Sequence, residues 1–233
     1  MTFVTEHLIN QKWPAKQPEI LQLYSFPTPN GVKVSIALEE MGLPYEPHTV
    51  KLNETTTPEF LALNPNNKIP AIIDPDGPNG EPIALWESGA ILIYLSEKTG
   101  KLMPSSPASR ARVLQWLMFQ MGGIGPMFGQ FGYFSKFAGS EIEDPRPRQR
   151  YQDEARRLLA VLEKQLSANE YVAGDQYSIA DIALWPWIYA AKEFYDAEAA
   201  FGYDDLPNVL RWFELCVARP ASQRGLKIPD RDA

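Results

Sequence analysis

A short turn with the sequence Thr28-Pro29-Asn30-Gly31 separates a predicted strand from a predicted helix. The first backbone N–H groups of a helix have no partner within the helix, and the helix dipole favours negative charge there. A thiolate at this place would be stabilised, and its pKa would fall below the free-thiol value of about 8.5. Thr28 and Asn30 can each donate a hydrogen bond to it. The same residues also suit an ordinary helix start, with Thr28 as the N-cap and Pro29 in the first turn.

A second predicted helix opens with Glu87-Ser88-Gly89, directly after an apolar segment. Its backbone N–H groups and the Ser88 hydroxyl can form a carboxylate pocket, and Glu87 can pair with an ammonium group. Because these two charges are adjacent in an α-amino acid, Glu-Ser at one helix start matches an amino-acid head group. Ordinary helix capping is the alternative.

A third segment, Asn66-Asn67-Lys68-Ile69-Pro70, precedes another predicted strand. A cis peptide bond at Ile69-Pro70 would present the backbone N–H and C=O of Ile69 to a ligand lying alongside. Lys68 can reach a ligand carboxylate, or it is a solvated surface charge. Together the three segments suit a ligand that has a thiol, a peptide backbone and a free amino-acid end.

The composition excludes several other chemistries. The 233 residues carry 22 Lys+Arg and 29 Asp+Glu, a net charge of −7, whereas phosphate binding to nucleic acid favours a basic surplus. His7, His48 and Cys216 are the only residues of their types, so we expect no Cys/His zinc cluster, no metal and no intramolecular disulfide. Neither histidine lies near a nucleophile motif, which argues against a Ser-His-Asp triad.

Targeting signals are also missing from the pattern. No run approaches the ~18–20 apolar residues that span a bilayer, and residues 1–20 resemble no signal peptide. We therefore expect a cytoplasmic protein without a membrane partner. A thiol stays reduced there, and we interpret Cys216 as a buried small hydrophobic residue.

The elements that must position these segments follow from hydrophobic spacing. The predicted strands are 21–25, 45–52, 69–73 and 83–86, and the predicted helices between and after them are 34–41, 57–63 and 87–98. This order predicts a small mixed sheet with helices on both faces. Pro70 removes a ladder donor, so it should lie on an edge strand or mark a sharp bend.

Beyond the sheet region only helical periodicity remains, over residues 110–120, 151–166, 178–195 and 206–218. Ser178 and Asp181 fit a capping box, which we interpret as structural. The chain is thus predicted to comprise an N-terminal extension (1–20), a sheet domain (21–101), a linker (102–109), an all-helical domain (110–222) and a tail (223–233). The polar extension favours an extended arm, with an arm over a partner subunit as the alternative.

Four motifs resemble those of cytosolic glutathione S-transferases over about residues 21–220: LYSFPTPNG, NPNNKIPAIID, ESGAILIYL and YSIADIALWPW. PTPNG and GGIGPMFGQ are most similar to the bacterial Nu class, the disulfide-bond oxidoreductase type. They are also similar to the transferase-like domain of the yeast prion-forming nitrogen regulator. The resemblance implies an α+β two-domain fold, with a thioredoxin-like βαβαββα domain that binds glutathione and an all-helical bundle that shapes the second-substrate pocket.

The resemblance also implies roles for individual residues. Thr28 and Asn30 match the Nu-class residues that hold the glutathione thiolate, which makes them the catalytic candidates. Lys68 matches the contact to the glycine end of glutathione, and Ile69 matches the backbone contact to its cysteinyl part.

The remaining contacts map to two other regions. Glu87 and Ser88 match the contacts to the γ-glutamyl group. Arg150 looks like a Nu-class arginine that reaches bound glutathione, with an exposed helix charge as the alternative. Tyr24 and Ser25 lie on a strand, and we expect them to be packing or solvent residues rather than thiol donors.

The implied activity is glutathione-dependent disulfide reduction by a symmetric homodimer, with two glutathione molecules or one glutathione disulfide bound and with modest transferase or peroxidase activity. A chain with one cysteine cannot exchange disulfides within itself, so bound glutathione must supply the thiols. A conventional conjugating transferase for electrophilic xenobiotics and a non-enzymatic glutathione-binding regulator are the alternatives.

Overall fold

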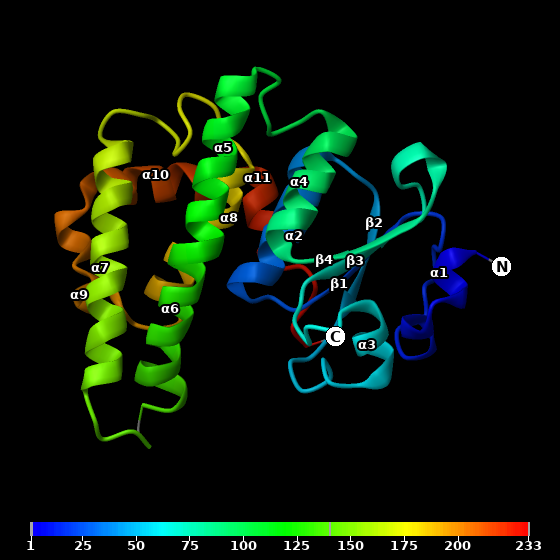
Figure 1. Cartoon of the computed structure of the whole chain (residues 1–233), viewed down its shortest axis with the longest axis horizontal. Helices are drawn as coiled ribbons and strands as arrows, with labels where there is room; N and C mark the ends of the chain where they lie inside the picture. Colours follow the sequence, from blue (N-terminus) through cyan, green and yellow to red (C-terminus); the bar gives the residue numbers. More distant parts are fainter. Residues whose placement is uncertain (1, 140, 233) are drawn as a thin grey trace. The chain divides into compact units, whose positions relative to one another are not determined.

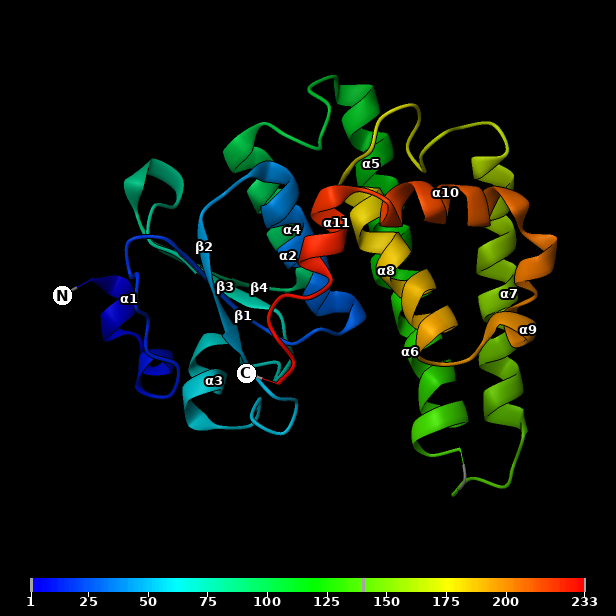
Figure 2. The same cartoon turned by 180° about the vertical axis from the view of Figure 1, so that it is seen from behind.

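The computed structural model describes residues 2–139 and 141–232 of the chain (Figure 1, Figure 2). It divides into two compact units. We call Met1–Lys101 with Pro220–Ala233 the sheet unit, and Leu102–Arg219 the helical unit. In the described ranges, no helix is both long enough and apolar enough to cross a membrane.

The sheet unit contains a four-stranded mixed sheet in the order β2-β1-β3-β4. The strands are β1 (Leu21–Ser25), β2 (Tyr45–Thr49), β3 (Ala71–Asp74) and β4 (Ile83–Trp86). A helix connects β1 to β2, which permits their parallel pairing. β1 pairs with β3 and β3 pairs with β4 in antiparallel fashion. The predicted mixed sheet is therefore confirmed.

Helices cover both faces of this sheet, as the element order predicts (Figure 1). α2 (Pro29–Met41) and α4 (Ser88–Thr99) contact each other, and both end at a glycine in the left-handed conformation. α3 (Pro58–Leu63) contributes to a core cluster with the strands. Side chains of β3 point to both faces of the sheet. Ala71 belongs to the cluster with α3, whereas Asp74, three residues later and on the opposite face, contacts α4.

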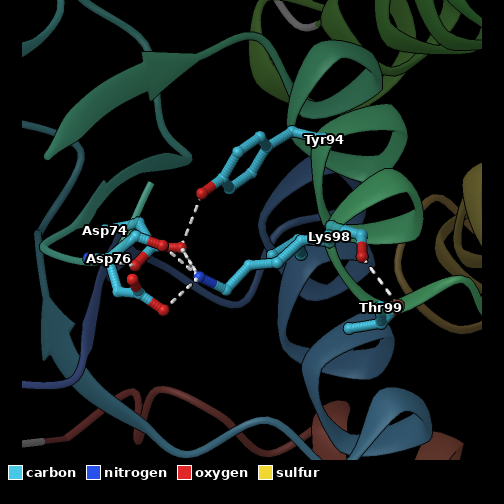
Figure 3. Close-up of polar contacts among 6 residues, drawn as sticks. Asp74, Asp76, Tyr94, Lys98 and Thr99 are labelled. Atoms are coloured by element: carbon cyan, nitrogen blue, oxygen red, sulfur yellow. Dashed lines mark hydrogen bonds and ion pairs between the residues drawn. The ribbon is translucent and has the colours of Figure 1, made fainter. Parts of the chain in front are cut away.

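The contact between β3 and α4 is an ionic cluster (Figure 3). Asp74 is buried and accepts a hydrogen bond of 2.6 Å from the Tyr94 hydroxyl. Lys98 Nζ lies 3.0 Å from the Asp74 carboxylate and 3.3 Å from that of Asp76. These carboxylates raise the pKa of Lys98 against the opposing effect of its partial burial. The cluster fastens α4 to the sheet.

The N-terminal extension folds into helical turns, α1 (Phe3–Glu6) and the 3-10 helix η1 (Leu8–Gln11). Val4 and Ile9 are fully buried in the core cluster that contains Phe60 of α3. The prediction of an extended arm is therefore wrong. Its apolar side chains are too few and too widely spaced to show a period, yet they fill a core formed by distant residues.

The residues that follow the extension's helical turns cover edge strand β2. The Trp13 indole N–H donates to the backbone oxygen of Thr49 at 3.0 Å. The carboxylate of Glu46 accepts from the backbone N–H groups of Lys16 at 3.0 Å and Gln17 at 2.8 Å. Covering an edge in this way blocks pairing with other chains.

The end of the chain returns to the sheet unit through α11 (Pro220–Gly225), which contacts α2. The Ser35 hydroxyl donates to the backbone oxygen of Gly225 at 2.7 Å. A Cβ atom on Gly225 would lie 2.7 Å from the backbone of Ile36, so the close contact requires glycine. The structure thus differs from the predicted division into a helical domain to residue 222 and a separate tail.

The helical unit contains α5 (Pro107–Phe119), α6 (Gly125–Gly132), α7 (Arg146–Leu166), α8 (Ile179–Glu193), α9 (Glu198–Phe201) and α10 (Pro207–Val217). Two π-helical turns, η3 (Gln120–Ile124) and η4 (Tyr133–Phe137), flank α6. α5 begins at Pro107, inside the segment predicted as a linker, because proline suits the first turn of a helix.

The predicted capping box is present at the start of α8. Asp181 is fully buried and accepts hydrogen bonds of 2.9 Å from the backbone N–H groups of Ser178 and Val172. It also accepts from the Ser178 hydroxyl and the Trp212 indole N–H, both at 2.9 Å. Burial raises the pKa of Asp181 against the effect of these donors. The carboxylate therefore joins three segments of the helical unit.

Candidate functional site

The register of the sheet brings the three candidate segments to one end of the sheet. Tyr24 lies opposite Ala71, and Ala71 lies opposite Trp86. Because β3 runs antiparallel to both neighbours, the last residues of β1, the first residues of β3 and the last residues of β4 meet at this end. The turn after β1, the loop before β3 and the helix start after β4 must therefore converge. These are the three segments in which the sequence predicted ligand contacts.

The turn after β1 starts α2 in a tightly constrained way. Thr28 is the N-cap, and its Oγ1 accepts a hydrogen bond of 3.2 Å from the Gly31 N–H. A Cβ atom on Gly31 would lie 1.9 Å from the backbone oxygen of Phe26 and 2.6 Å from Ser25 Oγ. Glycine therefore allows the helix to begin directly against the end of β1. The Thr28 hydroxyl, which accepts from Gly31, keeps its own hydrogen as a donor.

A buried lysine connects the first two candidate segments. Lys33 is fully buried on α2, one turn after Asn30. Its Nζ donates to Asn30 Oδ1 at 2.7 Å and to Ser88 Oγ at 3.3 Å. Burial lowers the pKa of Lys33 to about 7, against the opposing effect of the Glu87 carboxylate. The amide predicted to hold a thiolate and the hydroxyl predicted to hold a head group thus share one amine.

Glu87 has a backbone conformation that is unusual for its type. It is the N-cap of α4, with φ 73° and ψ 111°. Positive φ in a residue with a Cβ atom is strained, and such strain gathers at functional sites. The side chain is exposed, and Oε1 accepts a hydrogen bond of 3.3 Å from the amide of Asn66. The start of α4 is therefore linked to the loop before β3.

The loop before β3 is organised by asparagines. Asn64 is buried; its amide donates to the backbone oxygen of Lys68 at 2.6 Å, and its Oδ1 accepts from the Asn66 N–H at 2.9 Å. The peptide bond between Ile69 and Pro70 is cis, the conformation that the sequence analysis considered for it. β3 starts at Ala71, so Pro70 lies on a bend outside the ladder, the second of the two places predicted for it.

Lys68 and Ile69 differ in exposure. Lys68 is exposed, whereas the side chain of Ile69 belongs to the core cluster. The core therefore fixes the position of the Ile69 backbone, and the Lys68 ammonium keeps its access to solvent. Both features suit the predicted contacts with a peptide ligand and its terminal carboxylate.

Arg150 belongs to the helical unit. It lies in the second turn of α7, its side chain is 69% exposed, and its Nη1 is 3.8 Å from Glu154 Oε2. The sequence offered an exposed helix charge as the alternative for this residue, and its surroundings within α7 fit that description. Contact between Arg150 and glutathione stays a prediction.

Two strand residues that were not expected to be thiol donors, Tyr24 and Ser25, are buried. Tyr24 is fully buried and stacks on the His48 ring with centroids 4.6 Å apart, and burial raises its pKa. Ser25 is also fully buried, so of the two expectations for these residues, packing or solvent exposure, the structure shows packing.

Cys216 is buried and forms no disulfide. The described part of the chain contains no group of three or more His, Cys, Asp or Glu residues able to hold a metal ion.

Two residues that organise the site, Lys33 and Asn64, were not predicted from the sequence, and Asn66 was placed in a candidate segment without a role of its own. The signal for Lys33 was its place between Val32 and Val34 in a helix whose other neighbours are apolar or small. A charge surrounded by buried residues needs polar partners. The pattern could thus have marked Lys33 as unusual, but it could not have identified the atoms that Lys33 contacts.

Comparison with protein families matches residues 28–98 to the N-terminal domain of glutathione S-transferases and residues 126–220 to their C-terminal domain. The disulfide-bond oxidoreductase YfcG of Escherichia coli (strain K12) is 45% identical to the chain over 212 residues, which cover 89% of the chain and 94% of YfcG.

Solved structures are similar over nearly the whole chain. A glutathione transferase from Burkholderia graminis with two glutathione molecules bound per subunit is 61% identical, with a TM-score of 0.97 and coverage of 99% of this chain and 97% of that one. A glutathione transferase from Pseudomonas putida with one glutathione disulfide bound per subunit is 55% identical, with a TM-score of 0.95 and coverage of 98% and 100%. Ure2p in complex with glutathione is 31% identical, with a TM-score of 0.81 and coverage of 94% and 99%. The chain therefore belongs to the glutathione S-transferase family and resembles its Nu class of disulfide-bond oxidoreductases.

Proposed function

We propose that the protein is a glutathione-dependent disulfide-bond reductase of the Nu type, which binds two glutathione molecules or one glutathione disulfide. The proposal rests on the convergence of the three segments at one end of the sheet, where Lys33 joins Asn30 to Ser88. Relatives solved with two glutathione molecules and with glutathione disulfide support it.

The chemistry rests on stabilising a thiolate at the start of α2. The Asn30 amide and the Thr28 hydroxyl donate to the sulfur of bound glutathione, and the helix dipole favours its negative charge. A lower thiol pKa increases the thiolate fraction at neutral pH, and the thiolate is the attacking form. Cys216 is buried, so the ligand supplies the reacting sulfur atoms.

Disulfide reduction then takes two exchanges. The first glutathione thiolate attacks one sulfur of the substrate disulfide, which forms a mixed disulfide and releases the other half as a thiolate that takes up a proton. The thiolate of the second glutathione attacks the glutathione sulfur of the mixed disulfide. The second substrate thiol leaves, and glutathione disulfide remains. The protein contributes alignment and charge stabilisation rather than electrons.

The other candidate residues bind the ends of glutathione. Glu87 pairs with the γ-glutamyl ammonium, and the Ser88 hydroxyl with the first N–H groups of α4 binds the adjacent carboxylate. The Ile69 backbone pairs with the cysteinyl part, and Lys68 binds the glycine carboxylate. Arg150 makes a further contact with bound glutathione.

The test is reduction of 2-hydroxyethyl disulfide by glutathione. We expect Asn30→Ala and Thr28→Ala to lower turnover by about tenfold or more, because each removes a hydrogen bond to a charged sulfur. Undiminished turnover in both variants would overturn the assigned roles. Tight glutathione binding without any turnover would favour a non-enzymatic regulator.

Conjugation of glutathione to electrophiles is a second candidate activity, because the same stabilised thiolate attacks an electrophilic carbon as well as a disulfide. The family membership favours it. Strong activity with chlorodinitrobenzene and negligible disulfide reduction would make conjugation the main function.

We also propose that the protein works as a symmetric homodimer in the cytoplasm. C2 pairing is the commonest assembly of soluble proteins. Light scattering coupled to size exclusion would measure the mass: twice 26.3 kDa is expected, and 26.3 kDa would contradict the proposal.

A further inference from the structure

We propose that Lys33 is a positioning residue for the thiolate, which orients the amide of Asn30 and ties it to the head-group contact at Ser88. This inference rests on the proposed function, because it assigns a task within the same site. Lys33 itself is buried and acts through Asn30 and Ser88 rather than by direct contact with the reacting sulfur.

The hydrogen bond between Lys33 and Asn30 defines which way the amide points. The Lys33 ammonium has three donors and no acceptor. In this form its partner at 2.7 Å is the amide oxygen of Asn30, Oδ1, and not the amide nitrogen. The nitrogen lies on the other side of the planar amide, and it is the half that can donate to a thiolate. Loss of Lys33 removes this hydrogen bond, and an amide that turned over would present its oxygen, which repels the thiolate.

The contact with Ser88 has the same logic. Lys33 Nζ donates to Ser88 Oγ at 3.3 Å, so the hydroxyl accepts on that side and keeps its hydrogen as a donor. A carboxylate bound at the start of α4 requires that donor. One amine therefore sets the donor direction of two groups, at the starts of two different helices.

Burial makes this arrangement stiff. Lys33 and Ser88 have exposed fractions of 0% and 3%, so water does not compete for the hydrogen bond between them, whereas Asn30 is half-buried at the rim of the arrangement. Breaking these hydrogen bonds in a buried site costs free energy, so Asn30 and Ser88 are held against the amine. Burial also lowers the pKa of Lys33, and a thiolate bound at Asn30 favours the ammonium form in return.

Variants separate this role from plain packing. Lys33→Met keeps an unbranched side chain of similar length and removes every donor. Asn30→Ala removes the amide that Lys33 orients, and the double variant completes a double-mutant cycle. Lys98→Met is a matched control, because Lys98 also donates to oxygen atoms in the sheet unit but contacts Asp74 and Asp76 instead.

The measurement is the pKa of the thiol of bound glutathione, followed by thiolate ultraviolet absorbance against pH. In the unsubstituted protein we expect a value below the free-thiol value. We expect Lys33→Met to raise it by about one unit, as loss of one well-oriented donor to a charge does. In the Asn30→Ala background the same substitution should have little further effect. Lys98→Met should leave the thiol pKa unchanged.

Two results overturn the inference: an unchanged thiol pKa in Lys33→Met, or shifts of Lys33→Met and Asn30→Ala that simply add. A failure of the proposed function looks different, because bound glutathione would then keep an ordinary thiol pKa in the unsubstituted protein. Chemical denaturation of each variant shows that it is folded. If Lys33 had a merely structural role, Lys33→Met would change the free energy of unfolding but not the thiol pKa of bound glutathione.

Discussion

Replacement of Lys33 by Met should stabilise the protein, and more so at low pH. The side chain is fully buried, and burial lowers its pKa from 10.5 to about 7. At ~1.4 kcal/mol per unit, a shift of about 3.5 units means that holding the charged form in the folded state costs on the order of 5 kcal/mol. Lys33→Met removes this cost and replaces the amine by an apolar group of similar size, a change that is often stabilising at buried charges.

The pH dependence has a definite sign. Below about pH 7 both the folded and the unfolded states hold the proton, so the full cost of the buried charge is present. Between about pH 7 and 10.5 only the unfolded state holds it, and the contribution of Lys33 to the free energy of unfolding becomes less unfavourable as the pH rises. The advantage of Lys33→Met should therefore be largest near pH 6 and shrink towards pH 10.

Urea denaturation at a series of pH values measures this advantage. Lys98→Met provides a control of opposite sign. Its neighbouring carboxylates raise the pKa of Lys98, so its removal should lower the free energy of unfolding throughout the range below that pKa. A stability difference between Lys33→Met and the unsubstituted protein that stays constant with pH, or that favours the lysine at low pH, would contradict a cost of burying the charged amine.

Three further substitutions test the roles of Glu87, Tyr24 and Asp181. Glu87→Gln should raise the KM for glutathione by about tenfold and leave the thiol pKa unchanged, because it removes the charge that pairs with the γ-glutamyl ammonium. Glu81→Gln, at another exposed glutamate, is its control. An equal KM for the two variants would contradict the pairing of Glu87 with the ammonium. Tyr24→Phe should leave disulfide reduction unchanged and stabilise the protein by about 1 kcal/mol, since the buried hydroxyl has no hydrogen-bond partner; a loss of turnover would place Tyr24 in the chemistry. Asp181→Asn should lower the free energy of unfolding by about 2–4 kcal/mol, because an amide cannot accept from all four donors; urea denaturation checks this, and an unchanged stability would contradict the structural role.

Local signals predicted most of the sheet unit. Thr28 and Pro29 mark the start of α2, and Gly42 marks its end, because their backbone preferences depend on neighbours in sequence. The three ligand segments were also predicted locally, since each lies at a strand-to-helix or loop-to-strand junction. Their convergence could be predicted only through the family resemblance, because strand register depends on pairing between distant residues.

The features that the sequence did not predict depend on contacts across the chain. Val4 and Ile9 have no periodic neighbours, and they are buried only because α3 and the sheet leave a surface for them. Gly225 reads as a loop residue, although its missing side chain lets α11 approach Ile36. Lys33 reads as one charge in a helix, and its role depends on Ser88, which lies 55 residues away.

The most direct test of the central claim is a crystal structure of the protein with glutathione disulfide, read for the two sulfur positions. We expect one sulfur within hydrogen-bond distance, about 3.5 Å, of Asn30 Nδ2 or the Thr28 hydroxyl, with the γ-glutamyl group at Glu87 and Ser88. Both sulfur atoms beyond reach of Thr28 and Asn30, or a γ-glutamyl group bound away from the start of α4, would contradict it.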